Sequence, residues 1–189
     1  MHAELCRDVA FEAAHRSTAV NPHELWAVLE DVNALAPRLI VDLWSDPAVR
    51  WAWWSLGARL VAVAPVEWYG MGFGQPQLPS SVVEIVGDPK DAGIRQRVVD
   101  QCAGRQPDVV VLGGPNGEDG VRLDWQAYAP MVRPGGAVLV HGIANDRFPG
   151  IARFWRGLDA LGGKELIGGD SPDGYGLVQV HGRDRLSHG

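Results

Sequence analysis

The stretch from Asp108 to Ile143 constrains the fold of this 189-residue chain more than any other part of it. Two short apolar runs, Val109–Leu112 and Ala137–Val140, flank a pattern typical of an amphipathic helix at about 119–131. The helical pattern ends before an Arg-Pro-Gly-Gly tetrapeptide at 133–136, because proline and glycine stop helices. Apolar strands joined by a helix are typical of parallel strands that are buried on both faces of a sheet. The stretch therefore predicts an α/β fold.

The same alternation extends over most of the chain. Further strands are predicted at Leu39–Trp44, Arg59–Ala64 and Val82–Val86, helices at Pro47–Leu56, Ala92–Cys102 and Phe148–Leu161, and a closing hairpin at 165–167 and 175–180. The first 36 residues are predicted to be helical, with Asn21 as a cap, Pro22 at the first helical position and Glu24 completing a capping box. These patterns predict a single domain, 1–189. In it a helical cap (1–36) precedes a doubly wound, Rossmann-like core (37–180), whose seven-stranded sheet is mostly parallel with an antiparallel C-terminal strand.

Charge and composition exclude several classes of partner. The net charge is −6 and the pI about 5.4, and there is no long basic run, so no nucleic-acid partner is expected. The N-terminal segment mixes charges into its apolar residues, so neither a signal peptide nor a membrane contact is expected. Cys6 and Cys102 lie far apart and match no metal-ligand spacing, which is typical of free thiols in a reducing compartment. A cytoplasmic protein is predicted.

The layout resembles the class I S-adenosylmethionine (SAM) methyltransferases, in particular small O-methyltransferases of the cephalosporin-hydroxylase type. The resemblance is carried by the stretch 108–143 and spans roughly 21–180. It implies that SAM would bind at the carboxyl ends of the strands. The family has a glycine-rich turn after the first strand, an acid after the second that binds the ribose, and an acid near the adenine after the third. In metal-dependent relatives, acids after the fourth and fifth strands hold a divalent cation.

The positions that correspond to the cofactor site are only partly retained. Asp42 keeps the acid of the first strand, but Trp44 stands where the family has its first glycine, and its side chain is expected to fill part of the SAM space. The second strand ends in Ala64 instead of an acid, and Glu67 either reaches back to the ribose or is a solvated loop acid. Asp88 matches the acid after the third strand, although it also suits a turn. Asp42, Trp44, Glu67 and Asp88 are thus the candidate cofactor-binding residues.

The positions that correspond to the metal and catalytic site are replaced more completely. Gly113, Pro115 and Gly142 stand where metal-dependent relatives have acids. A hard cation such as magnesium needs several carboxylate oxygens, so no metal site is expected. Asn116 and His141 remain as the candidate catalytic residues, and His141 is either a general base near neutral pH or a remnant of an ancestral site.

Three functions are consistent with these replacements. The first is a non-catalytic binding or structural protein, a pseudo-methyltransferase without a cofactor. It would contact a protein partner or its own copies, or form part of an assembled particle such as a virion, through the aromatic segments Trp51–Trp54 and Trp68-Tyr69. The second is a divergent SAM-dependent O-methyltransferase acting on a small molecule or sugar. The third is a cofactor-free enzyme that uses His141 as its base. The loss of site residues from an intact scaffold favours the first.

Overall fold

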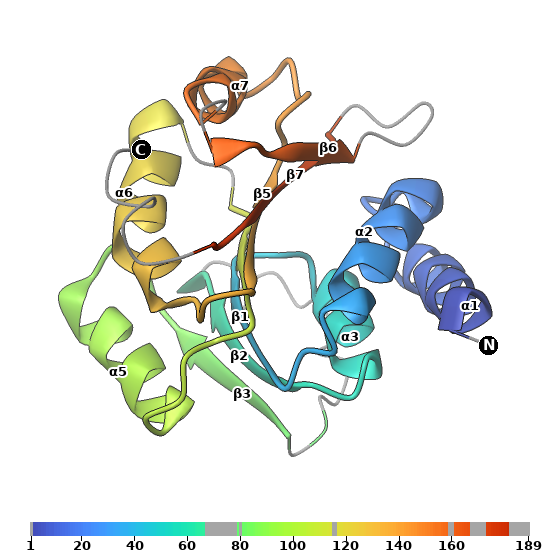
Figure 1. Ribbon diagram of the computed structural model, residues 1–189, viewed down its shortest axis with the longest axis horizontal. Helices are drawn as coiled ribbons and strands as arrows, with labels where there is room; N and C mark the ends of the chain where they lie inside the picture. The colour runs from blue at the N-terminus through green and yellow to red at the C-terminus, as the bar shows by residue number, and fades with distance from the viewer. Residues whose placement is uncertain are drawn as a thin grey trace.

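Figure 1 shows the elements of the computed structural model, which describes residues 2–66, 79, 81–114, 117–158, 161–166 and 173–181. The helices are α1 (His2–Arg16), α2 (Pro22–Ala34), α3 (Pro47–Ser55), α5 (Ala92–Cys102), α6 (Glu118–Tyr128) and α7 (Pro149–Arg156), with a 3-10 turn η1 (Ala129–Met131) after α6. The strands are β1 (Leu39–Leu43), β2 (Arg59–Ala64), β3 (Val82–Val86), β4 (Val109–Leu112), β5 (Ala137–His141), β6 (Lys164–Leu166) and β7 (Tyr175–Gln179).

All seven strands form one sheet in the order β3-β2-β1-β4-β5-β7-β6. The pairs from β3 to β5 are parallel, whereas β7 runs antiparallel to both β5 and β6. The predicted Rossmann-like sheet with an antiparallel C-terminal strand is therefore confirmed. The crossover from β3 to β4 places β1 in the middle, between β2 and β4. Because parallel strands end at the same edge, the loops after β1, β4 and β5 lie side by side.

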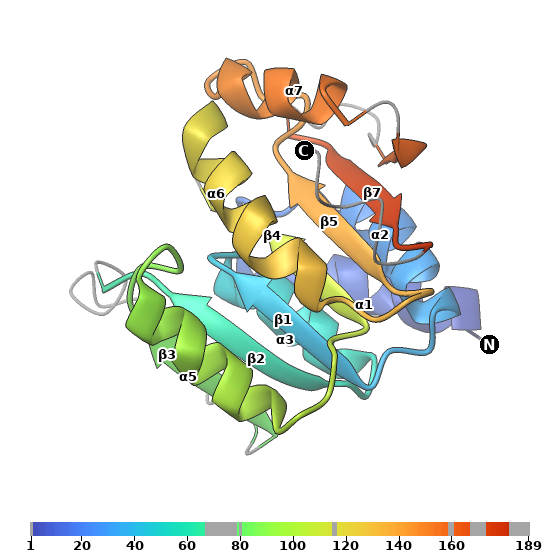
Figure 2. The same ribbon diagram turned by 60° about the vertical axis from the view of Figure 1, so that its left-hand side comes forward.

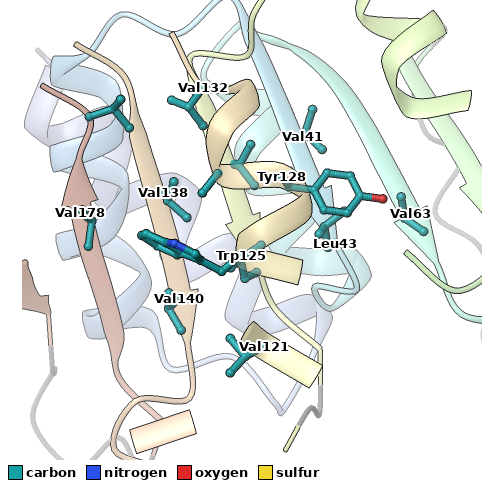
Figure 3. Packing of buried hydrophobic residues seen from close by; sticks show 14 of the residues in the cluster. Val41, Leu43, Val63, Val121, Trp125, Tyr128, Val132, Val138, Val140 and Val178 are labelled. Atoms are coloured by element: carbon teal, nitrogen blue, oxygen red, sulfur yellow. The ribbon is translucent and has the colours of Figure 1, made fainter. Parts of the chain in front are cut away.

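Helices cover both faces of the sheet, as Figure 2 shows. On one face α5, α6 and α7 pack on a buried cluster in which Trp125 and Tyr128 of α6 lie against strand valines (Figure 3). On the other face α1, α2 and α3 pack on a second cluster that contains Trp53. Alternation along β1 sends Leu43 into the first cluster, and Asp42 therefore points toward α3.

The carboxylate of Asp42 lies in a buried network under α3. Arg50, only 1% exposed, donates from Nε to Asp42 Oδ1 (3.3 Å), from Nη1 to Glu84 Oε1 (2.7 Å) and from Nη2 to the Val63 carbonyl (2.9 Å). Trp53 Nε1 donates to Asp42 Oδ2 (3.1 Å). The guanidinium thus joins side chains of β1 and β3 and the backbone of β2, which fixes the position of α3 on the sheet.

The tryptophans of α3 mainly serve packing. Trp53 is fully buried, so the predicted contact surface Trp51–Trp54 must be corrected for this residue. Trp51 is half-buried beneath the Arg16 guanidinium, 4.4 Å from the ring centroid, and the half-buried Trp54 donates to Ser81 Oγ (2.8 Å). The second predicted contact segment, 68–69, lies outside the described residues. Among the helices that the structure describes, none has the length and apolar character needed to cross a membrane.

Replacing Arg50 by methionine should destabilise the fold by about 3–5 kcal/mol, because it removes the guanidinium that pairs with the fully buried carboxylate of Asp42 and the partly buried one of Glu84. The matched control is Arg7→Met. Arg7 pairs with Asp8 at the exposed surface of α1, so its replacement should change the free energy of unfolding by less than about 0.5 kcal/mol. Urea unfolding of both variants provides the measurement. A loss below about 1 kcal/mol for Arg50→Met would contradict the structural role of this network.

Candidate functional site

A cavity of about 270 Å³ opens at the carboxyl ends of β1, β4 and β5. This edge is where open α/β sheets place their ligands. The floor is formed by the residues that follow the three strands, and the walls come from the start of α2 and from the segments before α7 and β7. The lining residues are Ala19, Val20, Asn21, Glu24, Leu25, Trp44, Ser45, Asp46, Val49, Gly113, Gly114, His141, Gly142, Asn145, Phe148, Ile151, Asp173 and Tyr175.

The backbone of Trp44 adopts a glycine-like conformation directly after β1. Its φ is +68°, and only Ala36 and Ala103 among the other described non-glycine residues share a positive φ. The left-handed region costs a side-chain-bearing residue about 1–2 kcal/mol. The Trp44 amide donates to the Val63 carbonyl at 3.0 Å, which ties the turn to β2. The turn thus has a backbone conformation typical of glycine at a position that carries the large side chain of tryptophan.

The indole of Trp44 extends across the sheet edge toward the loop after β3. Trp44 Nε1 donates to the Gly87 carbonyl at 3.3 Å, and Lys90 Nζ lies 5.0 Å from the ring centroid. Since β2 lies between β1 and β3, the ring passes over the end of β2. Trp44 therefore lines the cavity on one side and extends over the end of β2 on the other.

Asp42 does not line the cavity, although it was expected among the cofactor-binding residues. It is fully buried, and Oδ1 accepts a hydrogen bond from the Ser45 amide at 3.1 Å in addition to its contacts with Arg50 and Trp53. Burial raises its pKa, while Arg50 and Ser45 oppose the rise. The structure places Asp42 beneath the turn that carries Trp44, because its position in β1 faces α3.

Asp88, another expected cofactor residue, also lies outside the cavity lining. Asp88 is exposed, and its Oδ1 accepts from the Lys90 amide at 2.9 Å, so the structure shows it as a turn residue outside the cavity lining. Ala64 ends β2 without a carboxylate. Glu67 and the candidate catalytic residue Asn116 lie outside the described residues.

His141 reaches the cavity from the end of β5, as expected. Its ring stacks on Tyr175 with centroids 4.5 Å apart, and Nε2 lies 3.9 Å from Glu24 Oε1. Desolvation lowers the pKa of His141, while Asp173, the Gly113 backbone and Asp42 oppose the shift. A neutral imidazole at physiological pH can accept a proton or a hydrogen bond from a ligand.

The sequence patterns did not identify two carboxylates that line the cavity, those of Glu24 and Asp173. Asn21 caps α2 as predicted, accepting from the amides of His23 and Glu24. Glu24, however, also reaches the far end of the chain: it is 3% exposed and its Oε2 accepts from the Gly174 amide at 3.1 Å. Asp173 contributes a second carboxylate, which accepts a hydrogen bond from Asn145 Nδ2. The Glu24–Gly174 contact joins residues 150 positions apart in the sequence, so no local motif could predict it.

Close packing against the turn after β1 explains why a glycine, Gly113, follows β4. A Cβ on Gly113 would lie 2.7 Å from Ser45 Oγ and 3.1 Å from the Leu43 carbonyl, so the turn after β1 leaves no room for a side chain there. An acid at this position would force that turn to move. Within the described part of the chain there is no group of three or more His, Cys, Asp or Glu residues placed to hold a metal ion.

Comparisons with known proteins place the fold among the methyltransferases. No protein-family model and no curated protein sequence matches the chain. Among solved structures, MycE methyltransferase of mycinamycin biosynthesis, in complex with Mg and S-adenosylhomocysteine (SAH), superposes with a TM-score of 0.60 at 16% identity over 84% of this chain and 48% of MycE. This chain thus spans about half the length of MycE.

Two further matches cover a larger share of the matched protein's own chain. An O-methyltransferase from Bacillus cereus in complex with SAH gives a TM-score of 0.56 at 16% identity, over 94% of this chain and 90% of that one. The TDP-rhamnose 3'-O-methyltransferase of calicheamicin biosynthesis gives 0.59 at 14% identity, over 79% and 77%. The chain therefore has the fold of the class I SAM-dependent O-methyltransferases, which confirms the resemblance at the level of the fold.

The lowered pKa of His141 predicts a pH dependence of stability. The unfolded chain protonates this histidine near pH 6.5, whereas the folded chain does so only at lower pH, so folding loses stability as the pH falls through this range. The His141→Gln variant should therefore lose less stability than the wild type between about pH 7.5 and 5.5 in urea unfolding. An equal or larger loss in the variant would contradict the assignment, as would an NMR titration midpoint of His141 above about 6.5.

Proposed function

We propose that this protein is a non-catalytic binding protein of the methyltransferase fold, which holds a small ligand at the strand tips and does not use SAM. The observation that carries the proposal is the Trp44 indole, hydrogen-bonded to the Gly87 carbonyl across the end of β2. A nucleoside cannot share this volume with an indole. SAM binding in the family manner would require the ring to leave its hydrogen bond and its packing.

Three further features support the proposal that SAM does not bind at the tips of β1 and β2. β2 ends in Ala64, so the described part of this tip offers no carboxylate to the ribose hydroxyls. Asp42 is held by Arg50, Trp53 and Ser45 inside the protein. The cavity that remains, about 270 Å³, lies just below the range of about 300–1,000 Å³ that is usual for drug-sized ligands. It fits a ligand smaller than SAM.

A second candidate is a SAM-dependent O-methyltransferase that acts on a small molecule or sugar. The comparisons favour this candidate, because the matching structures are O-methyltransferases and several contain SAH or SAM. His141 at the cavity would then be placed to take a proton from a substrate hydroxyl. The barrier to SAM binding would be the displacement of Trp44, including one hydrogen bond worth about 0.5–1.5 kcal/mol.

Calorimetric titration with SAM and SAH separates the two candidates. The proposal predicts that the wild type binds neither with a Kd below about 1 mM, and that Trp44→Gly improves the affinity at least about tenfold by opening the space over β2. Trp54→Ala is the matched control, since it removes an indole from α3 but leaves the strand tips unchanged. Micromolar binding by the wild type, or transfer of radiolabelled methyl groups to a hydroxylated acceptor, would establish the methyltransferase instead.

A further inference from the structure

A groove of about 710 Å³ lies at the amino ends of the strands, at the sheet edge opposite the strand-tip cavity. It runs between the start of α1, the end of α3 and the residues that begin β1 and β2. Its lining includes the apolar side chains of Leu5, Val9, Trp51 and Trp54 and the two arginines Arg38 and Arg59. We call it the amino-edge groove. It shares none of its described lining residues with the strand-tip cavity.

Neither arginine of the groove has an acidic partner within the described part of the chain. Arg38 is exposed, and only its backbone amide bonds, to Asp108 Oδ2 at 2.7 Å. Arg59 donates from Nη2 to the neutral side chain of Gln101 at 3.2 Å. No aspartate or glutamate is among the described lining residues, although the whole chain has a net charge of −6. The amino-edge groove is therefore a local positive site that attracts anions.

The apolar side chains of the groove are accessible and held in place. Leu5 is 47% exposed, and Trp51 and Trp54 are half-buried. Trp54 Nε1 donates to Ser81 Oγ, and the Arg16 guanidinium lies over the Trp51 ring, so both indoles are fixed before a partner arrives. A surface that is already ordered loses little conformational entropy on binding. Tryptophan and arginine are also the residue types that dominate protein–protein contacts.

We propose that the amino-edge groove docks a segment of a partner protein in which acidic residues flank aromatic or aliphatic side chains. The carboxylates would pair with Arg38 and Arg59, and the apolar side chains would pack on Leu5, Trp51 and Trp54. A protein segment fits better than a small molecule, because exposed and half-buried side chains leave the occupant open to solvent on one side. The net negative charge of the chain disfavours a second copy as the occupant. The inference does not depend on what binds at the strand tips.

Fluorescence anisotropy with labelled synthetic peptides tests the inference on the full chain. The peptide Glu-Glu-Phe-Leu-Glu-Glu should bind with a Kd of about 10–300 μM, and its affinity should fall as salt is added. Gln-Gln-Phe-Leu-Gln-Gln lacks the charges and Glu-Glu-Ser-Ser-Glu-Glu lacks the apolar side chains, so each should bind at least about tenfold more weakly. Equal binding of the three peptides, or a Kd above about 1 mM for the first, would overturn the inference.

A pair of double variants assigns the charge contacts. Arg38→Gln with Arg59→Gln should weaken the acidic peptide with Phe and Leu at least about tenfold and leave the binding of the glutamine peptide unchanged, because only ionic contacts are lost. The matched control is Arg95→Gln with Arg97→Gln, which removes the same charge from exposed positions of α5 and should change the affinity less than about twofold. Equal weakening by the two pairs would contradict a specific role of the groove.

A second pair of variants assigns the apolar contact. Leu5→Asp should abolish detectable binding of the same peptide, whereas Leu123→Asp, at a similarly exposed position of α6, should leave it unchanged. Circular dichroism verifies that each variant is folded. Two other occupants would overturn the inference. Wild-type dimers in sedimentation velocity that Leu5→Asp dissociates would show that a second copy covers the groove. Tighter binding of a labelled oligothymidylate than of the acidic peptide would show a nucleic-acid site.

Discussion

The buried carboxylate of Asp42 determines the shape of the whole strand-tip region. It accepts a hydrogen bond from the Ser45 amide and, on the side of α3, from Arg50 and Trp53. These bonds hold the turn after β1 in one conformation. That conformation gives Trp44 its positive φ and sends the indole toward Gly87. Asp42 thus supports the turn from inside the protein.

The replacements at the strand tips are physically coupled to this turn. Ser45 lies so close to Gly113 that a side chain after β4 would require the turn after β1 to shift. The indole lies over the end of β2, and the cavity lies beside the ends of β4 and β5 and the start of α2. Its charge then comes from residues outside the usual tips, above all Glu24 and Asp173.

The fold was predictable from the sequence because its signals are local and redundant. Apolar runs defined each strand of the core, and the glycine at 136 has a steric role, since a Cβ there would lie 2.4 Å from the Asp108 carbonyl. The site was less predictable because its geometry depends on which face of the sheet each strand residue points to, and on contacts between residues far apart in the sequence. Strand alternation turns Asp42 toward α3, and Glu24 bonds to Gly174, which is 150 residues away. His141 was predicted at a strand tip, where open α/β sheets place their ligands, and it does line the cavity.

The most direct measurement is a pair of crystal structures, of the wild type and of Trp44→Gly, each soaked under identical conditions with SAH. The account predicts that the wild-type indole remains bonded to the Gly87 carbonyl with no adenosine over β2, while the variant shows adenosine in the vacated space. Adenosine bound over β2 in the wild type, with the Trp44 ring displaced, would contradict the central claim that this tryptophan closes the cofactor half of the fold.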